Sequence, residues 1–215
     1  MTDGLSRTAQ LARDLIRFDT QNWGGGRSSG EADAAAYVAE VLASMGVESQ
    51  TLESAPGRAS VIARIEGTDP SLPLLVVHGH LDVVPADASE WSVDPFAGEI
   101  RDGCLWGRGA VDMKQMDAMI LAALERILAA GRRPRRGLVI AFFADEEAGG
   151  EYGAHWLVRE HPELFAGATE AISEVGSTFF VRLGWDTVPR LPMAATVELT
   201  DYPSSHRAAG VRLIY

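Results

Sequence analysis

The fold is decided by one stretch, Leu74-Leu75-Val76-Val77-His78-Gly79-His80-Leu81-Asp82-Val83-Val84-Pro85. Its first four residues are apolar and predict a strand that is buried on both faces. Polar residues follow where this strand emerges, and burying them costs free energy unless they find partners. His80 and Asp82 lie two residues apart, so they point to the same side of an extended chain. Because a metal-bound histidine commonly pairs with a carboxylate, the two residues suggest a metal site, although a solvated loop is the simpler alternative.

Composition restricts the class of protein. The chain has 215 residues, 47% of them hydrophobic and 23% charged, and a net charge of −11. These values are ordinary for a soluble globular protein of one large domain or two small ones, and the negative charge argues against a nucleic-acid partner. Cys104 is the only cysteine, so no internal disulfide can form. Together with an N-terminus that lacks an apolar run, this predicts a cytoplasmic protein without membrane association.

Hydrophobic periodicity predicts strands that alternate with helices. Helices are expected at 6–18, 31–45, from about 114 to Gly131, and at 153–160; strands at 47–52, 60–65, 74–77, 137–144 and 168–173; a flexible loop at 23–30; and a hairpin at 99–106. This alternation predicts an α/β sandwich with a largely parallel core. The basic turn at 132–136 is expected to be a solvated helix end rather than a nucleic-acid patch.

Three of the apolar strands end in residues that can bind metal. The candidates are His80 and Asp82 after the first, Glu146 and Glu147 after the second, and Glu174 after the third, with Asp112 at a loop-to-helix junction. Histidine and carboxylate ligands without cysteine suit zinc, cobalt or manganese. In a pair of adjacent carboxylates, one can bind a metal while the other acts as a general base. Each feature also has a structural alternative: Asp112 could cap a helix, and 145–147 could be an acidic surface turn.

Three motifs carry a resemblance to a known family. They are Gly79-His80-Leu81-Asp82-Val83-Val84-Pro85, Gly107-Arg108-Gly109-Ala110-Val111-Asp112-Met113-Lys114, and Asp145-Glu146-Glu147, with Glu174 downstream. In this order they resemble the zinc-dependent family of aminoacylase, carboxypeptidase G, acetylornithine deacetylase and succinyl-diaminopimelate desuccinylase. The resemblance covers roughly residues 5 to 176. It implies a three-layer, zinc-exopeptidase-like sandwich with a mixed, largely parallel sheet.

The resemblance also implies roles for individual residues. Two zinc ions, or cobalt in their place, would be held by His80, Asp112, Glu147 and Glu174, with Asp112 as the bridge between them. Glu146 would be the general base, and Asp82 would orient His80. A cis peptide bond is implied between Asp112 and Met113. Of the remaining histidines, His78 is expected to be structural, His155 to form a surface pair with Glu151, and His161 to lie in a loop.

The family pattern is incomplete in this chain. Family members are about twice as long and include a lid or dimerisation domain and a C-terminal histidine ligand. We therefore expect residues 1–176 to be the N-terminal part of the catalytic domain and 177–215 to be an atypical tail, truncated or frameshifted. His206 could be offered as the missing ligand, but its surroundings do not match the family.

The expected function is that of a metal-dependent hydrolase of amide or peptide bonds, of the N-acyl amino acid deacylase or exopeptidase type. Its partners would be small N-acyl amino acids or peptides, and it would form a homodimer only if a lid domain were present. We expect the 215-residue chain to be inactive. One alternative is a non-catalytic truncated paralogue that binds one metal or none. Another is an aminopeptidase of related fold with a different ligand order.

Overall fold

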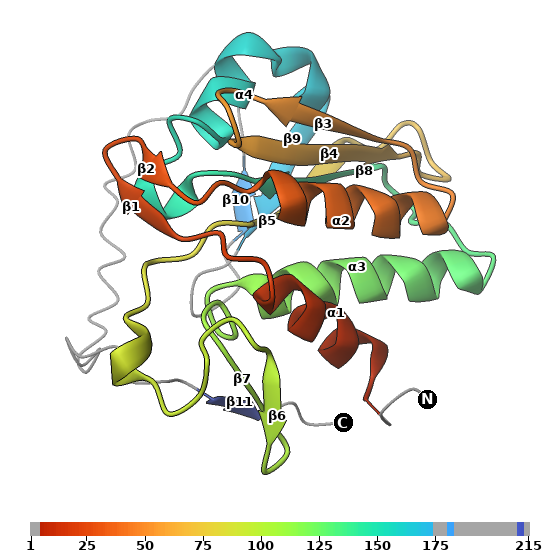
Figure 1. Ribbon diagram of the computed structural model, residues 1–215. Coiled ribbons are helices and arrows are strands. Elements are labelled where there is room, and N and C mark those ends of the chain that lie inside the picture. The colour runs from red at the N-terminus through yellow and green to blue at the C-terminus, as the bar shows by residue number, and fades with distance from the viewer. Residues whose placement is uncertain (1–4, 174–179, 183–209, 213–215) are drawn as a thin grey trace.

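A mixed sheet of six strands forms the middle layer of the molecule (Figure 1). The structure is a computed structural model that describes residues 5–173 and the backbone of 180–182 and 210–212. Across the sheet, the strands are β10 (Phe180–Arg182), β9 (Ala168–Ile172), β5 (Leu74–His80), β8 (Leu138–Phe143), β4 (Ala59–Ile65) and β3 (Ser49–Glu53). The central strands β9, β5 and β8 are parallel to one another, and the outer strands pair antiparallel. The predicted mixed sheet is therefore confirmed, with its parallel part confined to the centre.

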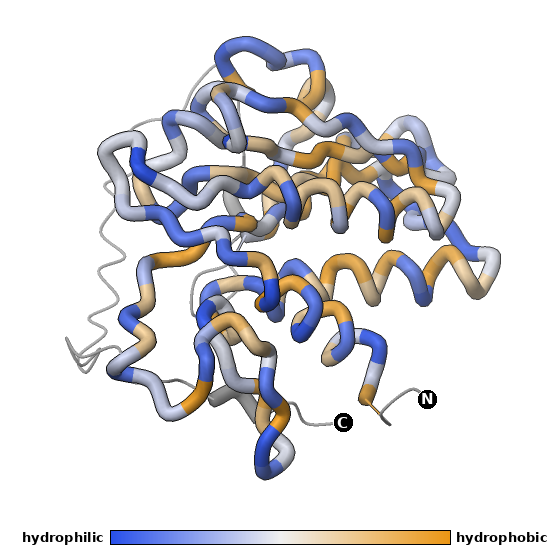
Figure 2. The backbone as a smooth tube through the Cα atoms, in the orientation of Figure 1, coloured by the Kyte–Doolittle hydropathy of each residue, from blue (hydrophilic) through white to orange (hydrophobic). Residues whose placement is uncertain are grey.

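Helices cover both faces of this sheet. On one face lie α1 (Arg7–Ile16), α2 (Ala32–Ser44) and α3 (Lys114–Ala129), and on the other lie α4 (Ala154–Glu160) and the 3₁₀ helix η3 (Pro162–Phe165). Figure 2 shows apolar and polar positions alternating along the helices α2 and α3, and the buried apolar residues of these helices belong to the core beside the sheet. The arrangement is a three-layer sandwich, as the family resemblance implies.

Strand β4 shows why the sequence builds two cores. Its residues Val61, Ala63 and Ile65 pack beneath α1, α2 and α3. Ile62, between them, packs on the opposite side with Leu157 of α4. Successive side chains of a strand point to opposite faces, so the middle of β4, which is covered on both sides, is apolar on both.

Small hairpins lie beside the sheet. They are β1 (Asn22–Gly24) with β2 (Arg27–Ser28), and β6 (Glu99–Arg101) with β7 (Cys104–Trp106), the latter extended by β11 (Gly210–Arg212). The second hairpin turns at Asp102 and Gly103, both with positive φ, and confirms the prediction. The first corrects the expectation of a flexible loop at 23–30, because Gly24, Gly25 and Gly26 adopt positive φ and close a paired turn.

The described residues also form the 3₁₀ helices η1 (Ala88–Glu90) and η2 (Glu146–Ala148). Within the described residues, no helix is long and apolar enough to cross a membrane. Glu174, His206 and most of the tail expected at 177–215 lie outside the described residues.

Candidate metal centre

His80 is the last residue of β5 and is buried, with 2% of its surface exposed. Its Nδ1 lies 3.0 Å from the backbone carbonyl of Asp82 and 3.4 Å from the Asp82 carboxylate. These contacts fix the ring so that the other nitrogen, Nε2, faces the acidic residues. Nε2 lies 3.1 Å from Asp112 Oδ1 and 3.6 Å from Glu146 Oε2.

Asp112 enters from the loop before α3. The helix cap is Met113, without a side-chain cap bond, so the alternative of Asp112 as an N-cap is excluded. The peptide bond between Asp112 and Met113 is cis, as the resemblance implies. Lys114, the next residue, is fully buried and donates from Nζ to the carbonyls of Leu15 (3.0 Å) and Phe18 (2.9 Å). The lysine therefore ties the Asp112 loop to the end of α1.

Glu146 and Glu147 enter on the turn that follows β8. This turn begins at Asp145, whose φ of 65° is left-handed, and reaches Gly149, whose φ is 97°. Glu147 Oε1 accepts a hydrogen bond from the backbone N–H of Val84 at 3.2 Å. Burial, together with the nearby Asp112 charge, raises the pKa of Glu147 to about 7. A positive ion at this position would relieve both effects.

His80, Asp112 and Glu147 converge at one point. Each offers one ligand atom, and these atoms lie within 4.8 Å of one another. One imidazole and two carboxylates are a donor set that suits a divalent ion such as zinc. Beside them, a cavity of about 290 Å³ is lined by His80 and Glu146, among other residues. With Asp82 against His80, five of the six predicted site residues are thus brought together, and Glu174 lies outside the described part of the chain.

Asp82 contacts both His80 and the turn that carries Glu146 and Glu147. Its carboxylate accepts hydrogen bonds from the backbone N–H groups of Glu146 (2.9 Å) and Glu147 (3.1 Å). Although burial alone would raise the pKa of Asp82, the His80 ring, the Asn22 amide and the Glu146 N–H hold it below its usual value. One buried carboxylate therefore contacts both the candidate histidine ligand and the turn that carries the two glutamates.

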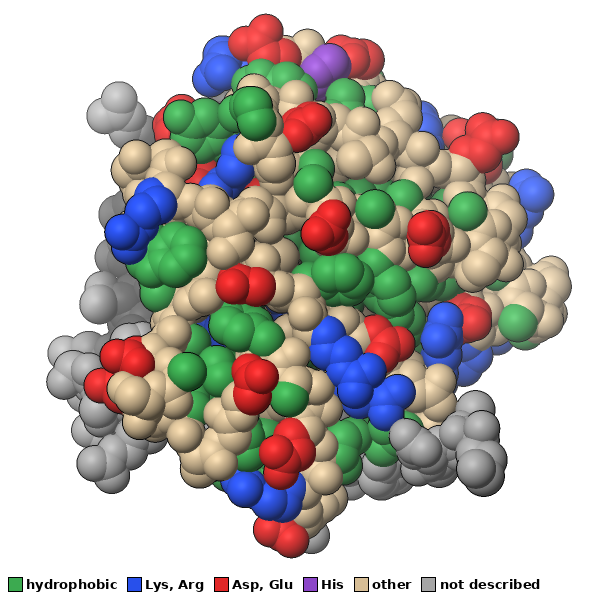
Figure 3. Space-filling model, viewed as in Figure 1, with side chains coloured by type: hydrophobic (Ala, Val, Ile, Leu, Met, Phe, Trp, Pro, Cys, Tyr) green, Lys and Arg blue, Asp and Glu red, His purple; other side chains and the backbone are tan. Residues whose placement is uncertain are grey.

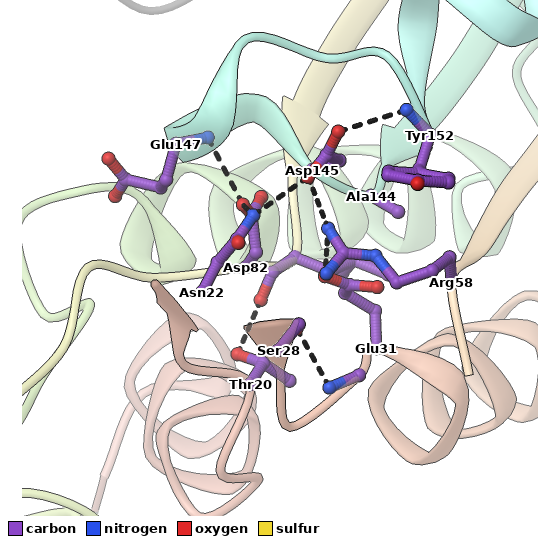
Figure 4. Close-up of polar contacts among 12 residues, drawn as sticks. Thr20, Asn22, Ser28, Glu31, Arg58, Asp82, Ala144, Asp145, Glu147 and Tyr152 are labelled. Atoms are coloured by element: carbon purple, nitrogen blue, oxygen red, sulfur yellow. Dashed lines mark hydrogen bonds and ion pairs between the residues drawn. The ribbon is translucent and has the colours of Figure 1, made fainter. Parts of the chain in front are cut away.

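Sequence reasoning missed the polar network beneath this turn, which Figure 4 shows. Asn22 bridges the carboxylates of Asp82 and Asp145, and Arg58 lies between Asp145 (2.5 Å) and Glu31 (3.2 Å). All five side chains are buried. Their positions in the sequence give no local signal, because Asn22 and Arg58 precede Asp145 by 123 and 87 residues.

The other singled-out residues have structural roles. His78 packs its ring against Phe143, and burial, with His80 nearby, lowers the pKa of His78 to about 4. His155 and Glu151 form the expected exposed pair at 3.2 Å. In the basic turn, Arg135 pairs with Asp69 across an exposed surface.

The fold and the site define a class: an α/β protein with a candidate metal centre at the carboxyl ends of parallel strands. Comparison with known proteins gives the family. The model for peptidase family M20/M25/M40 matches residues 76–209, and the chain belongs to this family.

Individual relatives agree with this assignment. Aminoacylase-1 of Sus scrofa is 36% identical over 134 residues, which are 62% of this chain and 33% of that protein. The N-fatty-acyl-amino acid synthase/hydrolase PM20D1 of Xenopus tropicalis is 36% identical over 58% of this chain and 24% of its own length. The crystal structure of human carnosine dipeptidase 1 shares the fold with a TM-score of 0.66 at 22% identity, over 78% of this chain and 38% of the other. The chain therefore spans about a third or less of the curated relatives.

Proposed function

We propose that the chain carries the metal centre of a hydrolase that cleaves amide or peptide bonds in small N-acyl amino acids or peptides. The observation that carries the proposal is the convergence of His80, Asp112 and Glu147 at the end of the parallel strands. Family membership and the names of the relatives, an aminoacylase and an N-fatty-acyl-amino acid hydrolase among them, support the choice of substrate class.

Zinc is the ion that we propose, with cobalt as a substitute. His80, Asp112 and Glu174 would hold one ion, and Glu147 would hold a second ion that shares Asp112. A divalent ion bound there would supply Lewis-acid chemistry and lower the pKa of a water molecule. Because the donor set is one imidazole with carboxylates, hard or borderline divalent ions fit better than soft ones.

Glu146 is the proposed general base. Its side chain is 53% exposed and lies 3.6 Å from His80 Nε2, so it reaches both the centre and the solvent. Its carboxylate would take a proton from the attacking water and return it to the leaving amine. Asp82 would hold His80 in the orientation in which Nε2 faces the centre.

We also propose that residues 1–176 are the N-terminal part of the catalytic domain. A cytoplasmic location remains a prediction from the cysteine content, and dimerisation remains a prediction from the resemblance.

The test of the proposal is metal stoichiometry. The folded wild-type chain should retain at least one zinc or cobalt ion after loading and dialysis. His80→Ala should lose it, whereas His155→Ala, which removes an exposed histidine paired only to a surface glutamate among the described residues, should not. A folded wild-type chain that retains no metal, or equal losses in the two variants, would contradict the proposal. Assays of a full-length version of the protein with N-acetyl amino acids and dipeptides then test the substrate class.

A further inference from the structure

The Asn22 side chain lies between two buried carboxylates. Its side chain is buried, with 4% of the residue exposed, and its single Nδ2 donates to two carboxylates: Asp82 Oδ2 at 2.8 Å and Asp145 Oδ1 at 2.9 Å (Figure 4). Its Oδ1 accepts the backbone N–H of Gly24 at 3.0 Å. Every polar atom of the amide is therefore used, and the hairpin β1–β2 holds the amide in place.

The two carboxylates that Asn22 joins accept hydrogen bonds from opposite ends of the turn that follows β8. Asp82 accepts the N–H groups of Glu146 and Glu147, where the turn begins. Asp145 accepts the N–H of Tyr152 at 2.9 Å through its second oxygen, where the turn returns toward α4. Without a shared donor, two buried carboxylates this close would repel each other and move apart.

An amide suits this position better than other side chains. A carboxylate would offer no donor, and a hydroxyl would offer one hydrogen where two are needed. On the far side, Asp145 is held by Arg58, so Asn22 is the link between this buried ion pair and Asp82.

From this geometry we infer that Asn22 is a positioning residue of the metal centre: by joining Asp82 to Asp145 it fixes the turn that presents Glu146 and Glu147. The inference rests on the proposed metal centre, although the positioning of the turn is a property of the metal-free chain. Residues that support metal ligands in this way typically change metal affinity when they are replaced.

The test uses Asn22→Leu, which keeps the approximate volume and removes both donors. We expect the dissociation constant for Co²⁺ to rise by about 10- to 100-fold and the visible spectrum of bound cobalt to change. The control is Gln21→Met at the preceding residue, just before β1. Gln21 is also a buried amide, but it contacts Asp19 and Ala86 instead of the network, so its loss should leave cobalt binding within about twofold of wild type.

A second measurement needs no metal. In the metal-free protein, the amide hydrogens of Glu146 and Glu147 should exchange slowly in the wild type and in Gln21→Met, and faster in Asn22→Leu. If Asn22→Leu does not fold, Asn22→Ser, which keeps one donor, should give intermediate exchange and affinity. Unchanged exchange together with unchanged cobalt affinity in a folded variant would overturn the inference. A wild type that binds no cobalt would instead overturn the proposed function, while the exchange data would still test Asn22.

Discussion

Glu146 and Glu147 are neighbours in the sequence, yet the fold gives them different surroundings. Glu147 is partly buried and bonded to Val84, whereas the side chain of Glu146 is 53% exposed and is directed at His80. A ligand needs a fixed position, and a general base needs access to water. The environments therefore support the assignment of the two roles.

The two variants Glu146→Gln and Glu147→Gln should separate these roles. In a full-length version of the protein, Glu146→Gln should keep the bound metal and lower turnover by about 100-fold or more, since the proton acceptor is lost. Glu147→Gln should lose metal. Metal analysis and amidase assays on the same preparations measure both effects. Metal loss from Glu146→Gln with full retention in Glu147→Gln would exchange the assignments.

Glu31 gives a prediction for pH. Burial raises the pKa of Glu31 to about 8, against 4.5 for an ordinary glutamate, while the Arg58 charge acts in the opposite direction. The folded chain therefore holds a proton that the unfolded chain releases. The stability that this proton contributes is complete below about pH 4.5 and is lost as the pH rises through about 8.

We expect the free energy of unfolding to decrease over this range, by at most about 1.4 kcal/mol per pH unit for one proton. Glu31→Gln, which keeps an acceptor for Arg58 without a charge, should flatten the slope. Denaturant titrations of both proteins between pH 5 and 9, with EDTA present, measure it. Parallel curves for wild type and variant would show that Glu31 is already ionised in the folded state.

At the scale of elements, β5 decides where the site is. It lies between β8 and β9 in the parallel part of the sheet, and its last residue is His80. Helix α3 packs against β5, and the buried side chain of Asp117 in α3 lies directly against Gly79 of the strand. The strand can approach the helix this closely because residue 79 has no side chain.

Gly79→Ala should therefore be strongly destabilising. The added Cβ would lie 2.0 Å from Asp117 Oδ1 and 3.2 Å from the terminal methyl of Met113, so the strand or the helix must move. Overpacking of this kind costs about 1–3 kcal/mol or more. The control is Gly103→Asn in the β6–β7 turn, where an added Cβ meets nothing within 4 Å and asparagine tolerates the positive φ. Urea unfolding measures both; equal losses would mean that β5 and α3 separate easily.

At the scale of the whole molecule, the candidate centre joins distant parts of the chain. Its residues come from the end of β5, the loop before α3 and the turn after β8. Figure 3 shows acidic side chains spread over the visible face of the molecule, consistent with a net charge of −11 that favours cation binding in general. Specific binding must therefore be separated from general attraction.

Metal should raise thermal stability through this centre. A ligand at 100 times its dissociation constant stabilises the folded state by about 2.7 kcal/mol, which for a chain of this size is about 5–10 °C in the melting temperature. Zinc should produce this increase in the wild type and little in His80→Ala, with magnesium as the control for general attraction. Equal increases in both proteins would place the bound metal elsewhere.

The sequence alone determined the elements and the main candidates of the site. Apolar runs identified β5 and β8, because strands buried on both faces must be apolar throughout. The motifs around His80, Asp112 and Glu147 named the residues that the structure brings together. These features are local: each depends on neighbours within a few positions of the chain.

Only the tertiary structure decided how the site is supported. The bonds of Asn22 span 60 residues to Asp82 and 123 to Asp145, and no periodicity or turn signal connects such positions. The same is true of the pairing of strands: parallel and antiparallel neighbours are chosen by how the connections cross the sheet, which local sequence does not encode. Local hydrophobicity thus determined the helices and strands. Long-range packing determined which buried polar groups became partners.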